Sequence, residues 1–511
     1  MFNFRTIVSG RKVCFIFLLL FVFALRTFAQ PGNAKSLNGT SANPAIVSVA
    51  KFGLRGDGSN EYKGFKDMVD WINMHPGQVQ VLMFEPKRKY FISQQITNPV
   101  KAPEDIAFLN VQDLVINGQG ATIVFDGNFI RSKSFQRMVR IYFKFCKNLE
   151  IDNLIIDGQR NITVNDPSFT NGKTNGVRVN SHSFCIQASS KVKLVNCTSI
   201  NALGDGFNVT SDYENIPRIP SRDIEIYDCR SYYSGRQGIS IGNVVNINIK
   251  NSEFSYSGQG PENSPYFAPA SGCDIEPNWG DSTISTVAVQ ENTKNIYITN
   301  CKFIANIHSQ FVCGGNPKKY GNIHVDSCYF SDEDTVKGYY SKGIYSIGLK
   351  STVSFENSTI VCKYAVISLA KFAKPDDLGN SEIIFKNNKV TFGQEQWIAS
   401  SEGMKSILIE NNRFIGTIMY NGSPAKKAVK TYISLKRNGD AIWKNNYVFI
   451  PPENITGDSP FAVFENWVIE NPKFETGVKP GTSSKIRIIA KGGSVKENSK
   501  RPDWLILEKQ D

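Results

Sequence analysis

The sequence predicts an all-β solenoid, a single-stranded right-handed parallel β-helix with a short helix that caps its N-terminal end. The main observation is a recurring phrase, in which a short alternating strand is followed by Asn or another polar residue and then by Cys, Ser or Asn. Repeats of one strand-rich unit with a period of roughly 20–50 residues indicate a solenoid. These segments lack the 3.6-residue apolar spacing of helical repeats. Copies of the phrase begin at Leu149, Val192, Ile224, Ile247, Ile296, Ile323, Val353, Ile383 and Ile407.

The first 29 residues have the pattern of a secretory signal peptide. Arg5, Arg11 and Lys12 precede an apolar run, Val13–Leu25, and the residues after it fit a small-residue cleavage site. Because the run is short for a membrane span, we expect an exported protein with no stable span after cleavage. Its location would be periplasmic, cell-surface or extracellular. Residues 30–46 are polar and are predicted to form a flexible leader.

Residues 47–112 are predicted to hold the N-terminal cap and the first coils. One segment has apolar residues on a single helical face, and two strands are predicted after it, Val79–Phe84 and Tyr90–Ile92. Residues 113–450 carry the repeats and are predicted to form the β-helix. Residues 451–511 break the rhythm and would supply further coils or a C-terminal cap, because a solenoid needs its last edge covered. The helical face consists of Phe65, Met68, Val69, Trp71 and Ile72.

Matched positions in successive repeats also explain the use of Asn and Cys. Stacked Asn side chains at a bend would satisfy backbone polar groups there. Of the 10 cysteines, Cys14 leaves with the signal peptide, so 10 − 1 = 9 remain. Most occupy one place in the repeat, and the chain lacks CxxC pairs and Cys/His metal spacing. We therefore expect buried, small apolar cysteines, with disulfides between neighbouring coils as an alternative, and neither a metal ion nor a cofactor.

The formal charge of +12 includes four basic residues of the signal segment, so the mature chain carries 12 − 4 = +8. A moderately basic exported protein would suit an acidic polymer such as a polyuronide, although a charge of this size over such a long chain also fits a merely solvated surface. Nucleic acid is not expected as a partner, because no run of Lys and Arg or basic helix is present. We expect a monomer.

Three segments are predicted to be successive strands of one surface: Gly204–Val209, Gly235–Ile241 and Gly272–Asn278. Each alternates apolar residues with glycine or polar residues, which is typical of a strand with one buried face. Stacking the apolar residues would gather carboxylates, amides and an arginine on one patch. The expected rows are Asn208, Ser240 and Asp274; then Thr210, Gly242 and Glu276; and, at the strand entries, Asp205, Arg236 and Gln237.

Two N-terminal stretches resemble a known group of proteins. Lys51–Gly58 resembles the opening of pectin-lyase-like β-helix proteins, and Val115–Ile123 resembles their first coils. Together with the repeats, this resemblance covers residues 47–446. It implies the fold but leaves the reaction open, because this architecture serves hydrolases, lyases, epimerases and phage tailspikes.

The patch itself resembles the polygalacturonase type of glycoside hydrolase. Asp205 falls on the first Asp of that family's Asp pair. In the next coil, Gly235–Gly242 resembles the glycine-rich motif that follows the Asp pair in that family. Gly206 replaces the second Asp, and Gln237 replaces the family's catalytic His. The resemblance therefore implies the position of a groove without carrying over the mechanism.

Asp274 and Glu276 offer a local replacement for the missing groups. Two residues apart on a strand, they share a face with Cα atoms about 6.5–7 Å apart. One would act as general acid, with its pKa raised by the other's charge, and its partner as base. We expect Asp205 to complete the catalytic set. The alternative is structural, with both carboxylates pairing with Arg236 or accepting from backbone amides.

The expected substrate-binding residues are Arg236, Gln237, Asn208, His308 and Trp279. Arg236 would bind a substrate carboxylate through two hydrogen bonds, or neutralise a uronate beside a lyase base. His308 falls one coil later near the same edge, and Trp279 lies in a flanking loop where it would stack on a sugar ring.

Together these features predict an exported enzyme that hydrolyses glycosidic bonds in a polysaccharide, with pectin-like, uronate-containing polymers among the candidates. Two alternatives remain open. One is a polysaccharide lyase or uronate epimerase that uses the same groove, and the other is a non-catalytic β-helix that binds glycans. The absence of lysine from the three strand segments favours hydrolysis over a lyase.

Overall fold

The structure is a computed structural model, and residues 45–511 form one compact unit in it. It describes residues 45–94, 106–127, 141–160, 181–212, 214–215, 218–260, 269–276, 293–313, 321–335, 341–346, 352–362, 367–369, 382–392, 398–400, 405–416, 433–435, 440–450, 462–465, 467–476, 486–496 and 505–510. The expected signal peptide, residues 1–29, and most of the expected leader, 30–46, lie outside these ranges. No helix among the described residues is long and apolar enough to cross a membrane.

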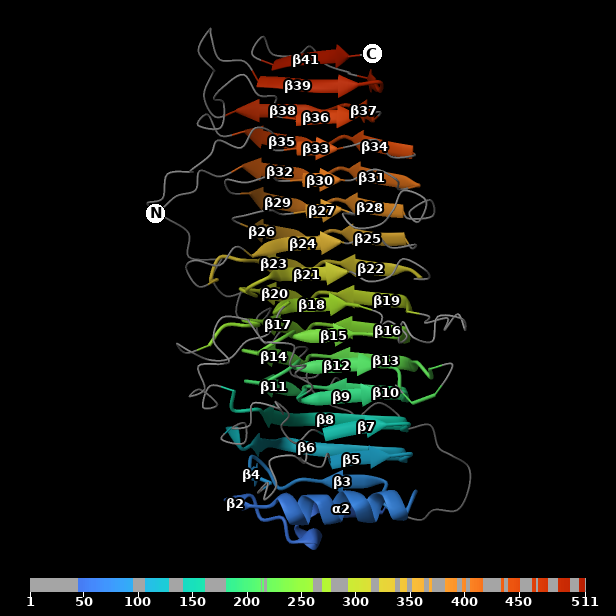
Figure 1. Cartoon of the computed structure of the whole chain (residues 1–511), viewed down its shortest axis with the longest axis vertical. Helices are drawn as coiled ribbons and strands as arrows, with labels where there is room; N and C mark the ends of the chain where they lie inside the picture. Colours follow the sequence, from blue (N-terminus) through green and yellow to red (C-terminus); the bar gives the residue numbers. More distant parts are fainter. Residues whose placement is uncertain are drawn as a thin grey trace, which may run out of the picture. The chain divides into compact units, whose positions relative to one another are not determined.

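Each full coil contains three short strands, and each strand pairs in parallel with its equivalents in the coils before and after it (Figure 1). Face 1 is the sheet of 14 described strands, and the other 27 form faces 2 and 3. The strand pairs among the described residues are all parallel. This confirms the predicted parallel β-helix. Face 1 consists of β5 (Ile106–Leu109), β7 (Ile141–Lys144), β9 (Phe184–Gln187), β12 (Phe207–Thr210), β15 (Ile239–Ile241), β18 (Ser271–Ile275), β21 (Ser309–Cys313), β24 (Lys342–Ser346), β27 (Ile367–Leu369), β30 (Ile398–Ser400), β33 (Ile433–Leu435), β36 (Ala462–Glu465), β39 (Ile486–Lys491) and β41 (Leu505–Gln510).

The other two faces meet at a bend, and β6 (Gln112–Phe125) and β8 (Lys147–Asp157) each run through both of them. Face 2 also contains β1 (Ile46–Ser48), β3 (Val81–Met83), β10 (Ser190–Val195), β13 (Ser221–Tyr227), β16 (Val244–Lys250), β19 (Lys294–Thr299), β22 (Ile323–Asp326), β25 (Thr352–Glu356), β28 (Glu382–Lys386), β31 (Ser406–Glu410), β34 (Asp440–Lys444), β37 (Val468–Glu470) and β40 (Ser494–Lys496). Face 3 also contains β2 (Asp57–Asn60), β4 (Lys89–Ile92), β11 (Thr198–Ile200), β14 (Arg230–Tyr232), β17 (Glu253–Ser255), β20 (Lys302–Ile304), β23 (Tyr329–Ser331), β26 (Thr359–Cys362), β29 (Lys389–Phe392), β32 (Arg413–Gly416), β35 (Tyr447–Ile450) and β38 (Lys473–Thr476).

The N-terminal end is closed by η1 (Val49–Phe52), a 3-10 helix, and by α2 (Tyr62–Met74), the one α-helix of the described residues. The predicted apolar face of α2 is confirmed, since Phe65, Met68, Val69 and Ile72 are buried and Trp71 packs against the core. Asn73 extends the cap to the first strand of face 1. Its Nδ2 donates to the carbonyl of Ala107 (2.7 Å), and its Oδ1 accepts from the amide of Leu109 (2.9 Å). The helix therefore satisfies backbone groups that an open sheet edge would expose.

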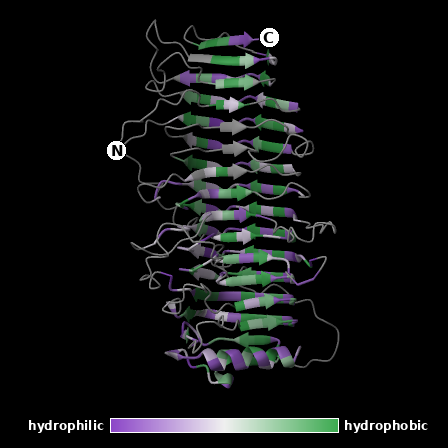
Figure 2. Cartoon of the chain, viewed as in Figure 1, coloured by the Kyte–Doolittle hydropathy of each residue, from purple (hydrophilic) through white to green (hydrophobic). Residues whose placement is uncertain are grey.

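The core is a set of apolar stacks that run from coil to coil. Phe184 and Phe207, on neighbouring strands of face 1, stack with ring centroids 5.0 Å apart. Figure 2 shows hydrophobic and hydrophilic residues alternating along the strands, which is the pattern of one buried and one outward face. Because neighbouring strands are in register, their outward side chains form straight rows from coil to coil. The residues of the site belong to such rows.

The bend between faces 2 and 3 holds the predicted side-chain ladders. One residue per coil there has positive φ, such as Asn300 at 52°, and Nδ2 of Asn300 donates to Oδ1 of Asn251 in the coil before (2.9 Å). The next residue is buried and accepts an amide from the adjacent coil, as Oδ1 of Asn412 does from Asn388 (2.8 Å). Cysteines occupy this second ladder in earlier coils. The nine cysteines after Cys14 are all free and buried, so the expectation of small apolar cysteines is confirmed over that of disulfides.

Candidate functional site

The expected outward row is present on face 1. Asn208, Ser240 and Asp274 are direct partners across β12, β15 and β18. Beyond the strand ends, the amide of Glu276 still donates to the carbonyl of Ile241 (3.0 Å), so Glu276 continues the register two residues past Asp274. The two carboxylates therefore belong to neighbouring outward positions on one chain segment.

A second row lies two residues before these strands. Because Phe184, Phe207 and Ile239 are register partners, the residues two positions earlier occupy equivalent places in their coils. They are His182, Asp205 and Gln237. Sequence reasoning included Asp205 and Gln237 and missed His182. The signal was the phrase Ser181-His182-Ser183-Phe184, which matches the polar–small–apolar pattern of the other two strand entries.

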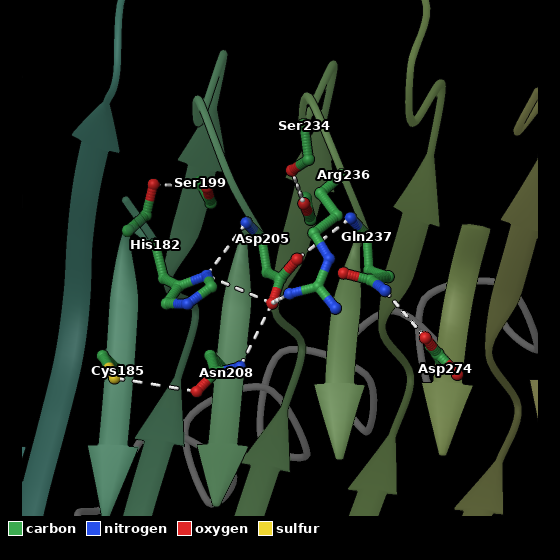
Figure 3. Close-up of polar contacts among 11 residues, drawn as sticks. His182, Cys185, Ser199, Asp205, Asn208, Ser234, Arg236, Gln237 and Asp274 are labelled. Atoms are coloured by element: carbon green, nitrogen blue, oxygen red, sulfur yellow. Dashed lines mark hydrogen bonds and ion pairs between the residues drawn. The ribbon is translucent and has the colours of Figure 1, made fainter. Parts of the chain in front are cut away.

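Asp205 is fully buried and its carboxylate is held from several sides (Figure 3). Its Oδ2 lies 3.1 Å from Nδ1 of His182 and 3.7 Å from Nη1 of Arg236, and it accepts a hydrogen bond from Nδ2 of Asn208 (3.1 Å). Its Oδ1 accepts from the backbone amide of Gln237 (3.2 Å). Burial raises the pKa of this carboxyl, but the charges of Arg236 and His182 and these hydrogen bonds outweigh it. The pKa therefore lies below its usual value of 3.8.

The residue after Asp205 has to be small. A Cβ atom on Gly206 would lie 2.0 Å from Oγ of Ser231 and 2.8 Å from the carbonyl oxygen of Gly238. The same crowding recurs at Gly238, where a Cβ would lie 2.7 Å from the carbonyl oxygen of Gly272. A second carboxylate at position 206 therefore has no room in this backbone. This gives a steric reason for one of the departures from the polygalacturonase pattern.

Asp274 is also buried, with 2% of its surface exposed, but its environment shifts its pKa in the opposite direction from that of Asp205. Burial and then the nearby charge of Glu276 raise its pKa to about 7, although Arg236 and Gln237 oppose the shift. Nε2 of Gln237 donates to Oδ2 of Asp274 (2.7 Å). Oε1 of Gln237 is buried and has no hydrogen-bond partner within the described part of the chain. The site thus pairs an ionised carboxylate at Asp205 with a carboxyl at Asp274 that changes charge near neutral pH.

A ligand can reach this hydrogen-bonded network only at its exposed groups. The side chain of Arg236 is 27% exposed, and Glu276 is partly exposed, whereas Asp205 and Asp274 lie beneath. Figure 3 shows the Arg236 guanidinium beside the Asp205 carboxylate, with Gln237 reaching across to Asp274. Arg236 forms an ion pair with Asp205, and its charge also acts on Asp274. An incoming ligand would therefore meet Arg236 and Glu276 first.

The two remaining expected residues have different outcomes. His308 precedes β21, where its amide donates to the carbonyl of Ala270 (3.2 Å) and its Nδ1 lies 3.3 Å from Oγ of Ser309. It therefore lies at the strand entry one coil beyond Asp274. Trp279 lies outside the described residues. Within the described ranges, no group of three or more His, Cys, Asp or Glu side chains is placed to hold a metal ion.

Comparisons with known proteins identify the fold. No family model and no curated protein sequence matches the chain. A family 28 exopolygalacturonase from Yersinia enterocolitica is structurally similar, with TM-score 0.53 and 15% identity over 86% of this chain and 80% of that one. The surface protein and adhesin PfbA of Streptococcus pneumoniae is similar with TM-score 0.51 and 14% identity, over 88% of this chain and all of that one.

The coils and these neighbours define the architecture: the chain has a right-handed parallel β-helix fold. One neighbour is a glycoside hydrolase and the other an adhesin. At such low identity, the likeness extends to the fold alone. The function must therefore be argued from the residues of the site.

Proposed function

We propose that this protein is an exported glycoside hydrolase that cleaves a polysaccharide on face 1, with Asp274 as the general acid and Glu276 as the general base. The observation that carries the proposal is the pKa of about 7 at Asp274, beside the partly exposed carboxylate of Glu276. A carboxylic acid that keeps its proton near neutral pH can protonate a leaving-group oxygen, which an ordinary Asp cannot do there.

The reaction requires two proton transfers. Asp274 gives its proton to the glycosidic oxygen as the bond from the sugar carbon to that oxygen breaks. Glu276 takes a proton from a water molecule whose oxygen then bonds to the same sugar carbon. The products are two saturated sugar ends, and the step leaves Asp274 deprotonated and Glu276 protonated. Transfer of one proton from Glu276 to Asp274 through solvent restores the starting state.

Asp205 has a positioning role in this proposal. Both of its oxygens are already engaged, by His182, Arg236 and Asn208 on one side and by the Gln237 amide on the other. It fixes the segment from which Gln237 reaches Asp274. It also holds the Arg236 guanidinium at the edge, where a substrate hydroxyl would bind.

Charge at this site favours neutral sugars over uronates next to Asp274. Asp205, Asp274 and Glu276 bring up to three negative charges, and the guanidinium of Arg236 is shared with Asp205. A substrate carboxylate beside Glu276 would meet a like charge. If the substrate is a pectin-like polymer, we therefore expect the enzyme to act at its neutral sugars.

The experiment is a screen of neutral and acidic glycans with product analysis. We expect new reducing ends with no ultraviolet absorbance, and loss of this activity in Asp274→Asn and in Glu276→Gln. Asp223→Asn is the matched control, because Asp223 is an exposed carboxylate on face 2. Absorbance that rises with each new reducing end would replace hydrolysis by β-elimination. Binding of several glycans with cleavage of none would replace catalysis by adhesion, the second candidate.

A further inference from the structure

A continuous row of basic and aromatic side chains runs along face 3, away from the site on face 1. Seven residues in successive coils are direct register partners, from Lys302 to Lys473. They include four cations and two tyrosines, and none of the seven is acidic. We call them the basic row: Lys302, Tyr329, Thr359, Lys389, Arg413, Tyr447 and Lys473.

The cations of the basic row are exposed, and those in its last coils surround a tyrosine. The guanidinium of Arg413 lies 5.0 Å from the ring centroid of Tyr447, and Nζ of Lys473 lies 5.4 Å from it. One carboxylate borders this part of the row. Glu475 accepts from the hydroxyl of Tyr447 (2.9 Å) and forms an ion pair with Lys473 (2.9 Å). At its other end the row borders Glu253, the partner of Lys302 in the coil before.

A different row in the same coils shows how this chain neutralises charge elsewhere. On face 2, lysine and glutamate alternate from one coil to the next, and each glutamate has a lysine on either side. The lysine–glutamate distances are 3.1, 3.7, 3.9 and 3.3 Å. We call this the charge ladder: Lys386, Glu410, Lys444, Glu470 and Lys496. The basic row has no such alternation, so its positive charge faces solvent largely uncompensated.

We propose that the basic row binds an extended acidic polysaccharide that lies along the axis of the β-helix. Neighbouring row positions are one strand spacing, about 4.8 Å, apart. A chain with one carboxylate or sulfate on each sugar presents charges in single file at a comparable step. Tyr329 adds a ring surface on which a sugar can pack. Double-stranded DNA, with one charge per roughly 1.7 Å of axis, needs a wider basic surface than one row.

This surface is independent of the proposed catalytic site, because its strands belong to face 3 and the site belongs to face 1. A protein with both would hold an acidic polymer on one face while it acts on neutral sugars at the other. Failure of either proposal leaves the other intact, since the basic row is tested by binding and the site by turnover.

The test compares two triple variants that remove the same charge from the same coils. The first is Lys389→Gln with Arg413→Gln and Lys473→Gln, in the basic row. The control is Lys386→Gln with Lys444→Gln and Lys496→Gln, in the charge ladder. Both are full-length chains that carry Asp274→Asn, so that cleavage of the ligand does not affect the binding measurement. Equal melting temperatures, within a few degrees, show that both are folded.

Binding is measured with oligogalacturonate, with its carboxyl-reduced neutral counterpart, and with a single-stranded oligonucleotide. We expect the parent to bind oligogalacturonate in a salt-sensitive manner. The basic-row variant should bind at least about tenfold more weakly, and the control should be unchanged. Equal losses in both variants, undiminished binding by the basic-row variant, or no binding by the parent would overturn the proposal. Tighter binding of the oligonucleotide than of oligogalacturonate would assign the row to nucleic acid instead.

Discussion

Asp205 and Asp274 are both almost fully buried on face 1, yet their pKa values shift in opposite directions. Burial raises the pKa of both. Around Asp205, the charges of Arg236 and His182 overcome that effect, whereas Asp274 has the carboxylate of Glu276 as a neighbour. Neighbouring charges, and not depth, therefore decide which carboxyl remains ionised and which one holds a proton near pH 7.

The largest expected effect comes from removing the proton of the buried acid. Asp274→Asn keeps the shape and the contact with Gln237 but cannot donate a proton to a leaving group. We expect turnover on a verified substrate to fall by about 10²–10⁴-fold, the usual contribution of general acid–base catalysis. The measurement is reducing-end release, and the Asp223→Asn control should retain full activity. Wild-type turnover by Asp274→Asn would remove the acid role from this residue.

Neutralising the other carboxyl should affect folding more than chemistry. Asp205→Asn leaves Arg236 and His182 beside a neutral amide, and breaking a buried ion pair costs about 3–5 kcal/mol. The free energy of unfolding in denaturant should therefore decrease at pH 7. The loss should start to shrink as the pH falls through 3.8, the ordinary value of the carboxyl in the unfolded chain. It should disappear below the lower pKa of the folded state, where wild-type Asp205 is protonated in both states. A loss that is the same at pH 3 and pH 7 would show that the charge of Asp205 is not its cause.

The pH profile of activity distinguishes the two carboxyls without mutation. Because Asp274 must be protonated to act as the acid, activity should decline above its pKa of about 7. With a single group limiting the rate, the decline approaches tenfold per pH unit. The profile of kcat/KM on a neutral glycan, measured between pH 5 and pH 9, checks this. Activity that stays constant across pH 8 would contradict it.

The raised pKa of Asp274 should also appear in the pH dependence of stability. The pKa of Asp274 is raised on folding, so the folded chain holds a proton that the unfolded chain releases above about pH 4. Wild-type stability should therefore decrease as the pH rises from 4 to 7. Asp274→Asn lacks this term, so its melting temperature relative to wild type should increase over that interval. Parallel melting curves for the two proteins across the interval would contradict the raised pKa.

The sequence predicted the parts of this molecule that depend on local pattern. Alternating strands, the apolar face of α2 and the Asn ladder all follow from the spacing of residue types, and the row through Asn208, Ser240 and Asp274 followed from matching the strands. His182 was missed because its phrase, Ser181–Phe184, gains meaning only when it is aligned with the strand entries at Asp205 and Gln237. Its role depends on register with a coil 23 residues later, at Asp205.

Other features depend on how the coils are arranged in space. The opposite environments of Asp205 and Asp274 arise from which neighbouring coil supplies the charge, and the segments themselves contain the same residue types. Arg236 illustrates this, since the sequence pointed to Asp274 and Glu276 as its partners, and the structure also gives it an ion pair with Asp205. The steric limit at Gly206 likewise depends on Ser231, from another face of the coil.

The most direct test of the account is the protonation state of Asp274 itself. Carboxyl ¹³C chemical shifts of Asp-labelled protein, assigned by comparison with Asp274→Asn and Asp205→Asn, report each titration separately. We predict a midpoint near pH 7 for Asp274 and a midpoint below 3.8 for Asp205. A midpoint near pH 4 for Asp274 would contradict the account, because the residue would then be ionised at neutral pH and unable to act as the acid.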